Sequence, residues 1–433
     1  MGKIKIILVL TISAVLLISC GPVKGANKDE VPADPDSAMA NEPVVVTVLN
    51  NKEEVSSQLN SLASAFNASQ TGIKVEIQSV YAGVDVQSTL KGYYLAGKMP
   101  DIITCEVAGF ANWEGLLVDL SDQEWVADTD AEYVDNTYGT LGFPYTTEAI
   151  GFAYNADILS SCGIDPSTLT SPGAYEEAFA LIDSKKEELG LTAVVGYCAE
   201  KENLFWSTGN HLFGAYLDSG LARDDTSNLD LLEAGQFDEQ RLSDFTSFIG
   251  LLNRYSDPDL LTTGSYDEQV QGFASGKYAF VTQGSWIGVL LSSSENYTGF
   301  SCGMAPYAFQ DGIDTILTSS PAWWAVSKEG NVEEAKAFLN WCASDEGQKI
   351  FVEQCGYVSP YKSCSYIADD PFAQTITDYL AAGKTSSWHW MNLKEGCQQY
   401  YIAPAFYNYA AGVTDAQGFM DELKAFATDI YAL

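Results

Sequence analysis

The alternation of apolar and polar positions predicts an α/β arrangement in the first part of the chain. Residues 44–49 (VVVTVL) form a β-branched run typical of a strand, and apolar residues then recur at helical spacing over residues 55–66. Residues 73–77 alternate as a second strand, and residues 100–106 (PDIITCE) form a third strand that looks buried. This succession of strands and helices is the pattern of an α/β domain with a largely parallel sheet.

The same kind of pattern continues toward the C-terminus. Residues 151–155 predict a further strand and residues 174–189 a helix, and two more amphipathic helices are expected over residues 333–343 and 419–430. A chain of 433 residues is long enough for two domains of ordinary size.

The N-terminus has the layout of an export signal. Lys3 and Lys5 precede an apolar run over residues 6–18 that is too short to span a bilayer. Residues 17–20 (LISC) resemble the lipobox of bacterial lipoproteins, which implies that Cys20 is acylated and becomes the first residue after cleavage. An ordinary signal peptide with an incidental cysteine is the alternative. The signal peptide is therefore expected to be residues 1–19, and the polar residues 20–43, which contain no aromatic side chain, are expected to form a flexible tether.

The charge of the chain restricts its partners. The net charge is −36, and loss of residues 1–19 would remove only the two lysines and change it to −38. An acidic surface of this size repels phosphates and argues against nucleic acid as a partner. The net charge does not exclude neutral or cationic ligands.

The cysteines do not indicate a metal site. Apart from Cys20, eight cysteines are scattered along the chain with no C-x-x-C pair, so neither a zinc site nor a dense disulfide framework is predicted. Cys355 and Cys364 are the nearest candidates for a disulfide. Free thiols acting as small buried apolar groups are favoured.

Patterns that resemble catalytic motifs fail on their context. Residues 299–303 (GFSCG) match G-x-S-x-G, but Pro306 makes the helix that must follow a nucleophile elbow implausible, and a strand leaving a turn is expected instead. His211 and His389 are the only histidines and lie far apart in sequence. Residues 224–230 have the oxygen spacing of half a calcium loop without its glycine and final glutamate, which favours a solvated loop. We expect no catalytic residue, no bound metal and no cofactor.

The aromatic content indicates a ligand cleft. The chain has 9 Trp, 24 Tyr and 20 Phe, and several tryptophans stand beside small or turn residues. Such rings can stack on the flat apolar faces of a pyranose, whose hydroxyls hydrogen-bond to Asn, Asp, Glu and Gln. Any one of them could instead fill the core. These tryptophans are Trp206, Trp286, Trp323, Trp324, Trp388 and Trp390.

Five segments carry a family resemblance when they are taken in order behind the lipobox. They are residues 71–75 (TGIKV), 99–104 (MPDIIT), 142–159 (GFPYTTEAIGFAYNADIL), 273–286 (FASGKYAFVTQGSW) and 333–351 (EEAKAFLNWCASDEGQKIF). Together they resemble the extracellular solute-binding proteins of bacterial ABC sugar importers, of the maltodextrin-binding type.

The resemblance implies a two-lobed, periplasmic-binding-protein-like α/β fold, in which each lobe is a mostly parallel sheet flanked by helices. Lobe one is expected to comprise residues 44–147 and 320–365, and lobe two residues 148–319 and 366–433. The hinge is expected where the chain crosses between lobes, near residues 145–150 and 318–324.

The resemblance also implies a set of ligand-binding residues. Trp286 matches a stacking tryptophan of the family, and Glu148 matches the acid at the first crossing. The sequence departs from the maltodextrin binder at Thr104-Cys105, where that protein has a tryptophan, so maltose itself is not implied. The full set is Asn50, Lys52, Glu106, Glu148, Trp206, Trp286, Trp324, Trp388 and Trp390.

The function implied is that of a substrate-binding lipoprotein. It would capture a sugar or oligosaccharide between the lobes and deliver it to the permease subunits of an ABC transporter, as a monomer held by its lipid on the extracytoplasmic face of the cell membrane. Two alternatives stay open. One is the same fold binding a polyamine or another small solute, and the other is a surface glycoside hydrolase that uses two carboxylates such as Glu106 and Glu148.

Overall fold

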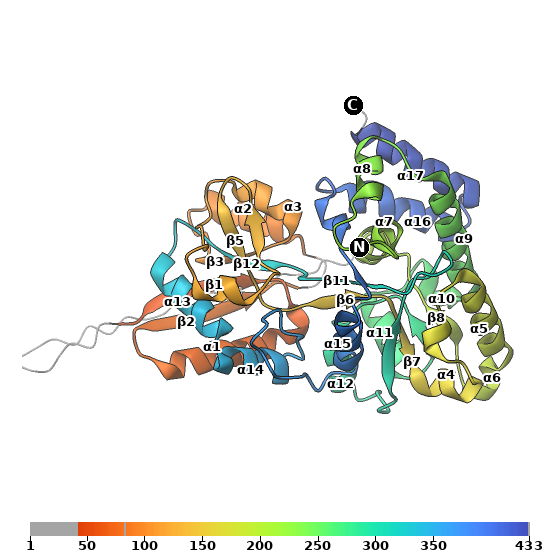
Figure 1. Cartoon of the computed structure of the whole chain (residues 1–433), viewed down its shortest axis with the longest axis horizontal. Helices are drawn as coiled ribbons and strands as arrows, with labels where there is room; N and C mark the ends of the chain where they lie inside the picture. Colours follow the sequence, from red (N-terminus) through yellow and green to blue (C-terminus); the bar gives the residue numbers. More distant parts are fainter. Residues whose placement is uncertain (1–41, 82–83, 432–433) are drawn as a thin grey trace, which may run out of the picture. The chain divides into compact units, whose positions relative to one another are not determined.

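The computed structural model describes residues 42–81 and 84–431, and Pro43–Leu433 form one compact unit (Figure 1). Cys20, the predicted signal peptide and all of the predicted tether except residues 42–43 lie outside the described residues. Within the described ranges, no helix is both long enough and apolar enough to cross a bilayer.

A six-stranded sheet has the order β2-β1-β3-β12-β5-β4. β1 pairs in parallel with β2 and with β3, as the sequence predicted. The inward side chains Val46 and Val48 of β1 share a core with Leu59 and Phe66 of the following helix, because strand alternation and helical spacing place these apolar side chains on facing surfaces. The strands are β1 (Val44–Asn50), β2 (Ile73–Ser79), β3 (Ile102–Cys105), β4 (Tyr133–Asp135), β5 (Gly139–Pro144) and β12 (Trp323–Val326).

The fold class is confirmed, but the expectation of mostly parallel sheets is wrong. β12 lies between β3 and β5 and runs antiparallel to both, and β4 is antiparallel to β5. The physical reason is the route of the chain. It leaves this sheet at the end of β5 and re-enters it through the short link of residues 320–322, so β12 arrives in the direction opposite to the departing strand.

Two further sheets hold the other seven strands of the described residues. One has the order β10-β7-β9-β8 and the other β13-β11-β6. In the smaller sheet β6 and β11 are antiparallel neighbours, with Ser319 opposite Glu148. The strands are β6 (Glu148–Ile150), β7 (Phe152–Asn155), β8 (Ala193–Gly196), β9 (Tyr278–Val281), β10 (Cys302–Ala305), β11 (Ile316–Ser319) and β13 (Thr385–Ser386).

The chain therefore passes between the six-stranded sheet and the smaller sheets at two adjacent places. One passage joins β5 to β6 over residues 145–147, and the other joins β11 to β12 over residues 320–322. Both fall within the segments expected to cross between lobes. The residue boundaries of the two lobes stay a prediction.

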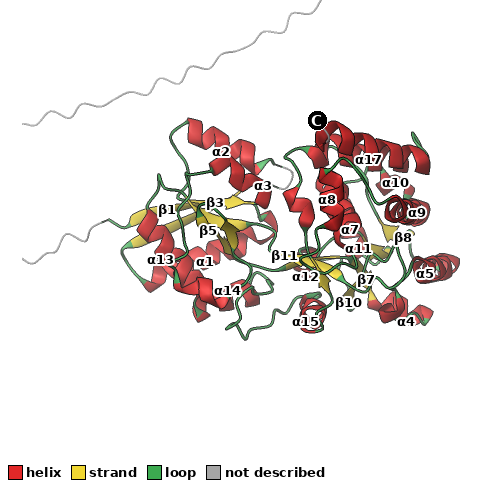
Figure 2. Ribbon diagram, turned by 45° about the horizontal axis from the view of Figure 1, so that its top comes forward, coloured by secondary structure: helices red, strands yellow, loops and turns green. Residues whose placement is uncertain are grey.

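Helices cover the faces of the sheets. Figures 1 and 2 show α1, α13 and α14 along one side of the six-stranded sheet, with α2 and α3 on the other side, and α5 and α9 beside β8. The helices are α1 (Ser56–Ser69), α2 (Val86–Leu95), α3 (Val107–Phe110), α4 (Ala156–Cys162), α5 (Pro172–Ser184), α6 (Lys186–Leu189), α7 (Phe213–Asp218), α8 (Ser227–Glu233), α9 (Glu239–Tyr255), α10 (Pro258–Leu261), α11 (Tyr266–Ala274), α12 (Ile287–Ser293), α13 (Val332–Ala343), α14 (Asp345–Glu353), α15 (Ala373–Ala381), α16 (Ala403–Ala410) and α17 (Ala416–Tyr431).

The helices predicted over residues 333–343 and 419–430 are confirmed as α13 and α17. The helix predicted over residues 174–189 is present as two shorter helices. The segment expected as a helix over residues 174–189 forms α5 and α6, which meet at Lys185. Ser171 caps α5 by accepting a hydrogen bond from the N–H of Ala174, and Pro172 occupies the first turn, where its missing N–H costs nothing. The buried side chains of α5, Tyr175, Ala178, Phe179 and Ile182, repeat at helical spacing.

The G-x-S-x-G segment is not a nucleophile elbow. Its last two residues begin the strand β10, so Ser301 precedes a strand and no helix follows it, as expected. The segment expected as a solvated loop over residues 224–230 instead enters α8 at Ser227. Eight cysteines are described, all as free thiols, and six of them are buried.

Candidate ligand-binding site

A cavity of about 700 Å³ is lined by residues from segments between Asn51 and Tyr400. This volume is in the range of pockets that hold small molecules. Its walls come from the exit of β1, the start of α2, the end of β3 and the start of β6, and from later segments around Trp206, Trp286 and residues 388–400. Seven of the nine predicted residues line it: Lys52, Glu106, Glu148, Trp206, Trp286, Trp388 and Trp390.

Four tryptophans and a histidine form one wall, which we call the indole box (Trp206, His211, Trp286, Trp388 and Trp390). The His211 ring lies 4.7 Å from the ring of Trp286 and 5.3 Å from that of Trp206, centroid to centroid. The rings of Trp390 and Trp388 lie 5.9 and 6.3 Å from it. The tryptophans thus surround the imidazole and present apolar surface to the cavity.

Glycines make room for two of these indoles. A Cβ on Gly284 would lie 1.9 Å from Cζ3 of Trp286, and a Cβ on Gly214 would lie 2.6 Å from Cδ1 of Trp390. Both distances are far shorter than a van der Waals contact. The position of each indole in the cavity wall therefore requires a residue without a side chain below it.

An acid and a histidine anchor the segment that carries Trp388 and Trp390. Asp218, at the end of α7, accepts hydrogen bonds from the backbone N–H of His389 at 2.9 Å, and its other oxygen lies 2.5 Å from Nδ1 of the same residue. The hydrogen bond to Asp218 raises the pKa of His389 above its ordinary value, although burial opposes the shift. His389 thus fixes both neighbouring tryptophans without lining the cavity itself.

A buried ion pair forms another part of the cavity wall. Lys52 Nζ lies 2.6 Å from Oε1 of Glu148 and 3.6 Å from Oε1 of Glu54. Burial alone would lower the pKa of Lys52, but the two carboxylates outweigh it and hold that pKa above its ordinary range. Lys52 also lies 6.0 Å above the ring of Trp286, so the ion pair and the indole box meet at this ring.

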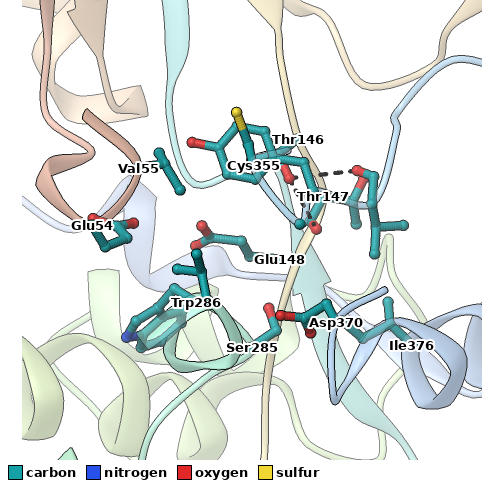
Figure 3. Close-up of a pocket in the computed structure, with 14 residues that line it drawn as sticks. Glu54, Val55, Thr146, Thr147, Glu148, Ser285, Trp286, Cys355, Asp370 and Ile376 are labelled. Atoms are coloured by element: carbon teal, nitrogen blue, oxygen red, sulfur yellow. Dashed lines mark hydrogen bonds between the residues drawn. The ribbon is translucent and has the colours of Figure 1, made fainter. Parts of the chain in front are cut away.

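A small cavity of about 20 Å³ is lined by both carboxylates that pair with Lys52, Glu54 and Glu148. Figure 3 shows the carboxylate of Glu148 beside Glu54 and near the indole of Trp286, with Thr146 and Thr147 of the first passage close by. Burial raises the pKa of Asp370, which lines the far side of the same cavity, to about 7. Because residues of the passage line this cavity, movement of the passage would change the surroundings of Glu148.

Glu106 follows β3 and faces the large cavity. Its side chain is exposed to the cavity, yet enclosure by the protein walls raises the pKa of its carboxyl to about 7, with Lys52 opposing the shift. At neutral pH this group can therefore accept hydrogen bonds and, when protonated, donate one.

Two of the predicted residues do not line the cavity. Trp324 is fully buried between Phe143 and Phe338, with ring centroids 6.3 and 6.1 Å away. Its place in the central strand β12 turns it into the core beneath the sheet, so, contrary to expectation, it does not line the cavity. Asn50 is also fully buried. Its amide donates to Lys52 O and to Ser79 Oγ, both at 3.0 Å, so it shapes the loop that carries Lys52.

Sequence reasoning missed several lining residues. His211 is the most central of them, and it lies on η5 (Ser207–Leu212), a π-helical turn that directly follows Trp206. The five-residue spacing from Trp206 matches neither a strand nor an α-helix face, so no periodic signal joined the two. The scarcity of histidine in the chain was the available clue. Other lining residues that were missed are Asn51, Glu54, Tyr81, Asp85, Gln87, Asn210, Tyr266, Glu395, Gln398, Gln399 and Tyr400.

Comparisons with known proteins agree with this arrangement. The profile of a family described as bacterial extracellular solute-binding protein matches residues 61–379. A curated relative, the sn-glycerol-3-phosphate-binding periplasmic protein UgpB of Pectobacterium atrosepticum, is 24% identical over 351 residues, which is 72% of each chain.

Solved structures share the fold. The apo form of RafE from Streptococcus pneumoniae has a TM-score of 0.70 at 19% identity, over 90% of this chain and 98% of its own. A sugar transporter from Bacillus licheniformis, solved in complex with stachyose, has a TM-score of 0.69 at 17% identity, over 88% of this chain and 98% of its own. At such low identity these likenesses establish the fold.

Proposed function

The chain belongs to the bacterial extracellular solute-binding protein family, and on this premise we propose that it captures a sugar or oligosaccharide and delivers it to an ABC importer. The indole box is the observation that carries this proposal. Four indoles line one cavity together with carboxylates and amides. Stacking faces beside hydrogen-bonding groups are what a pyranose requires.

The charges of the cavity disfavour an anionic ligand. Lys52 is the single lysine or arginine among the described lining residues, and Glu148 and Glu54 already neutralise it. A phosphate ester such as the ligand for which the UgpB relative is named would have no free cation to pair with and would face acidic groups. The acidic lining residues are Glu54, Asp85, Glu106, Glu148 and Glu395.

Capture would proceed by closure of two lobes around the ligand. We propose the predicted boundaries, with residues 44–147 and 320–365 in one lobe and residues 148–319 and 366–433 in the other. A ligand that contacts both walls gains its full set of contacts only when the lobes are closed, so it shifts the equilibrium toward the closed form by that difference in free energy. A micromolar dissociation constant, about −8 kcal/mol, is the expected scale.

The cavity is proposed to bind and release its ligand unchanged. A glycoside hydrolase needs one carboxylic acid that donates a proton and a second carboxylate on the other side of the bond. Glu148 is held by Lys52 at 2.6 Å, and this contact takes up an oxygen that the reaction would use. Recovery of intact saccharide after prolonged incubation would support binding without hydrolysis.

The lipid anchor is part of the proposal. Acylated Cys20 and the polar residues after it would hold the binding unit as a monomer on the outer face of the cell membrane, beside the permease subunits. One acyl chain gives only marginal attachment, so a diacylglyceryl group is expected on the thiol. Replacement of Cys20 by Ser should release the protein into the medium, and retention of that variant in the membrane fraction would contradict the anchor.

The test of the binding function is a thermal shift series on residues 21–433. The panel contains raffinose, stachyose, maltotriose, triacetylchitotriose, glycerol 3-phosphate and spermidine. Ligand at a hundred times its dissociation constant stabilises by about 2.7 kcal/mol, which is readily measured as a rise in Tm. We expect a shift with a saccharide that Trp286→Ala abolishes.

The matched control is Trp341→Ala. Trp341 packs on Phe66, with ring centroids 5.4 Å apart, and does not line the cavity, so its loss should lower Tm without removing the ligand-induced shift. A shift with only glycerol 3-phosphate or spermidine would keep the fold and refute the saccharide.

A further inference from the structure

His211 occupies the centre of the indole box, and no hydrogen bond of its side chain is found among the described residues. The side chain is 92% buried, since only 8% of its surface is exposed, and it lines the large cavity. Four tryptophan rings surround it within 6.3 Å. An imidazole in this position either forms a hydrogen bond with a bound ligand or leaves its ring nitrogens without a hydrogen-bond partner.

The two ring nitrogens differ in their surroundings. Nδ1 is enclosed and has no hydrogen-bond partner among the described residues. Nε2 is not enclosed in this way, and none of the hydrogen bonds of the described residues involves it. Nε2 is therefore the nitrogen through which His211 faces the cavity.

The surroundings also determine the form of the ring. Burial, reinforced by Lys52, lowers the pKa of His211 to about 3, so the imidazole is neutral at physiological pH and carries one proton. An enclosed N–H without an acceptor is rarer in proteins than an enclosed lone pair. The proton is therefore assigned to Nε2, and Nδ1 keeps its lone pair inside the box.

The geometry points to His211 as a specificity-determining residue that donates the Nε2–H hydrogen bond to a hydroxyl or ring oxygen of an uncharged sugar ring held among the indoles. This inference rests on the proposed function, and it names the chemical group of the ligand that the box selects. A neutral donor suits a neutral oxygen. A polyamine whose nitrogens are all protonated has no acceptor for this N–H.

The chain itself offers a direct measurement. It contains two histidines, so a ¹⁵N-histidine-labelled sample of residues 21–433 gives signals from His211 and His389 alone. We expect His211 to remain the neutral Nε2–H tautomer from pH 5 to pH 8, and its Nε2 proton to shift when the bound saccharide is added. His389, which is held by Asp218, serves as the internal reference. An Nδ1–H tautomer, or a ring that is charged at pH 6, would overturn the inference without any variant.

Binding measurements on two variants test the role of the donor. His211→Phe keeps a flat ring without a donor, and His211→Gln keeps an N–H donor without the ring. For the saccharide of the panel that binds the unaltered protein most tightly, His211→Phe should raise Kd about fivefold, the value of one neutral hydrogen bond. His211→Gln should recover most of this loss.

The outcomes separate the inference from the proposed function. If a saccharide binds and His211→Phe leaves its Kd unchanged, the inference is overturned and the saccharide function stands. If none of raffinose, stachyose, maltotriose and triacetylchitotriose binds the unaltered protein, the saccharide function fails and the inference fails with it. Loss of affinity in both variants alike would also overturn the role as donor, because it would show a need for the imidazole shape alone.

Discussion

The ion pair between Lys52 and Glu148 should be among the most energetically sensitive contacts of the cavity wall. The side chains are 12% and 6% exposed, and their charged atoms lie 2.6 Å apart. At an effective dielectric constant of about 20, attraction at this distance is about 6 kcal/mol, and Glu54 at 3.6 Å adds about 5 kcal/mol. Desolvation cancels much of this sum, so the measurable quantity is the cost of leaving one partner alone.

The variants Lys52→Met and Glu148→Gln should differ in how much unfolding free energy they lose. Lys52→Met leaves two carboxylates buried near each other with no cation, and we expect a loss near the upper end of the range for broken buried pairs, about 5 kcal/mol. Glu148→Gln leaves Lys52 with Glu54, and the loss should be nearer about 3 kcal/mol. In the double variant Lys52→Met with Glu148→Gln, only Glu54 keeps a charge. The double variant should therefore lose less unfolding free energy than the two single variants together, by at least about 2 kcal/mol.

Urea unfolding at pH 7, followed by tryptophan fluorescence, measures these free energies. The control is Lys74→Met, because Lys74 and Glu76 form a pair of nearly the same length, 2.7 Å, that is half exposed. Solvent screens that pair, so its loss should hardly change stability. Equal losses for Lys52→Met and Lys74→Met, or strict additivity in the double variant, would refute the argument from burial.

Three further predictions address other parts of the structure. His211, with its pKa lowered to about 3, cannot take up the proton that the unfolded chain binds below about pH 6.5. The contribution of His211 to stability should therefore fall on acidification, by about 2 kcal/mol between pH 7.5 and pH 5, and the difference in unfolding free energy between the unaltered chain and His211→Phe in urea titrations at both pH values should change by this amount. Gly284→Ala should displace the indole of Trp286 and weaken saccharide binding at least tenfold by calorimetry; unchanged affinity would mean that the indole is not needed where it lies. Trp324→Ala removes a large core side chain and should lower the unfolding free energy by about 3–5 kcal/mol, while Kd for the saccharide stays the same. A large rise in Kd would show that Trp324 contributes to binding.

Local patterns were sufficient for many of the elements and pointed to tryptophans of the cavity wall, whereas Lys52, Glu106 and Glu148 were expected from the family resemblance. The sequence predicted β1, α1 and β2 correctly. Each of these elements buries one face, so its apolar residues recur at a regular spacing that can be recognised from neighbouring residues. Tryptophans beside glycine and serine, as at Trp286 and Trp206, marked the cavity wall because small neighbours leave room for an exposed ring.

The direction of the strands needed the tertiary structure. Nothing in the residues of β12 tells whether it runs with or against β3, since a buried strand is equally apolar in both cases. The direction follows from the path of the chain, which returns from β11 through a three-residue link and must enter the sheet opposite to β5. A mostly parallel sheet was therefore a reasonable prediction from sequence and an incorrect one.

The choice between core and cavity was likewise made by packing. Trp286 follows Ser285, and the pair Trp323-Trp324 follows Ala322. Yet Trp286 lines the cavity and Trp324 is fully buried, because a strand at the centre of a sheet directs its side chain into the core. The grouping of His211 with four tryptophans depends on a π-helical turn and on the contact of segments almost two hundred residues apart. The sequence by itself determined which segments are strands and helices and that aromatic rings would be available at their ends. Only the tertiary structure decided which of those rings meet, because that depends on long-range packing that no local pattern records.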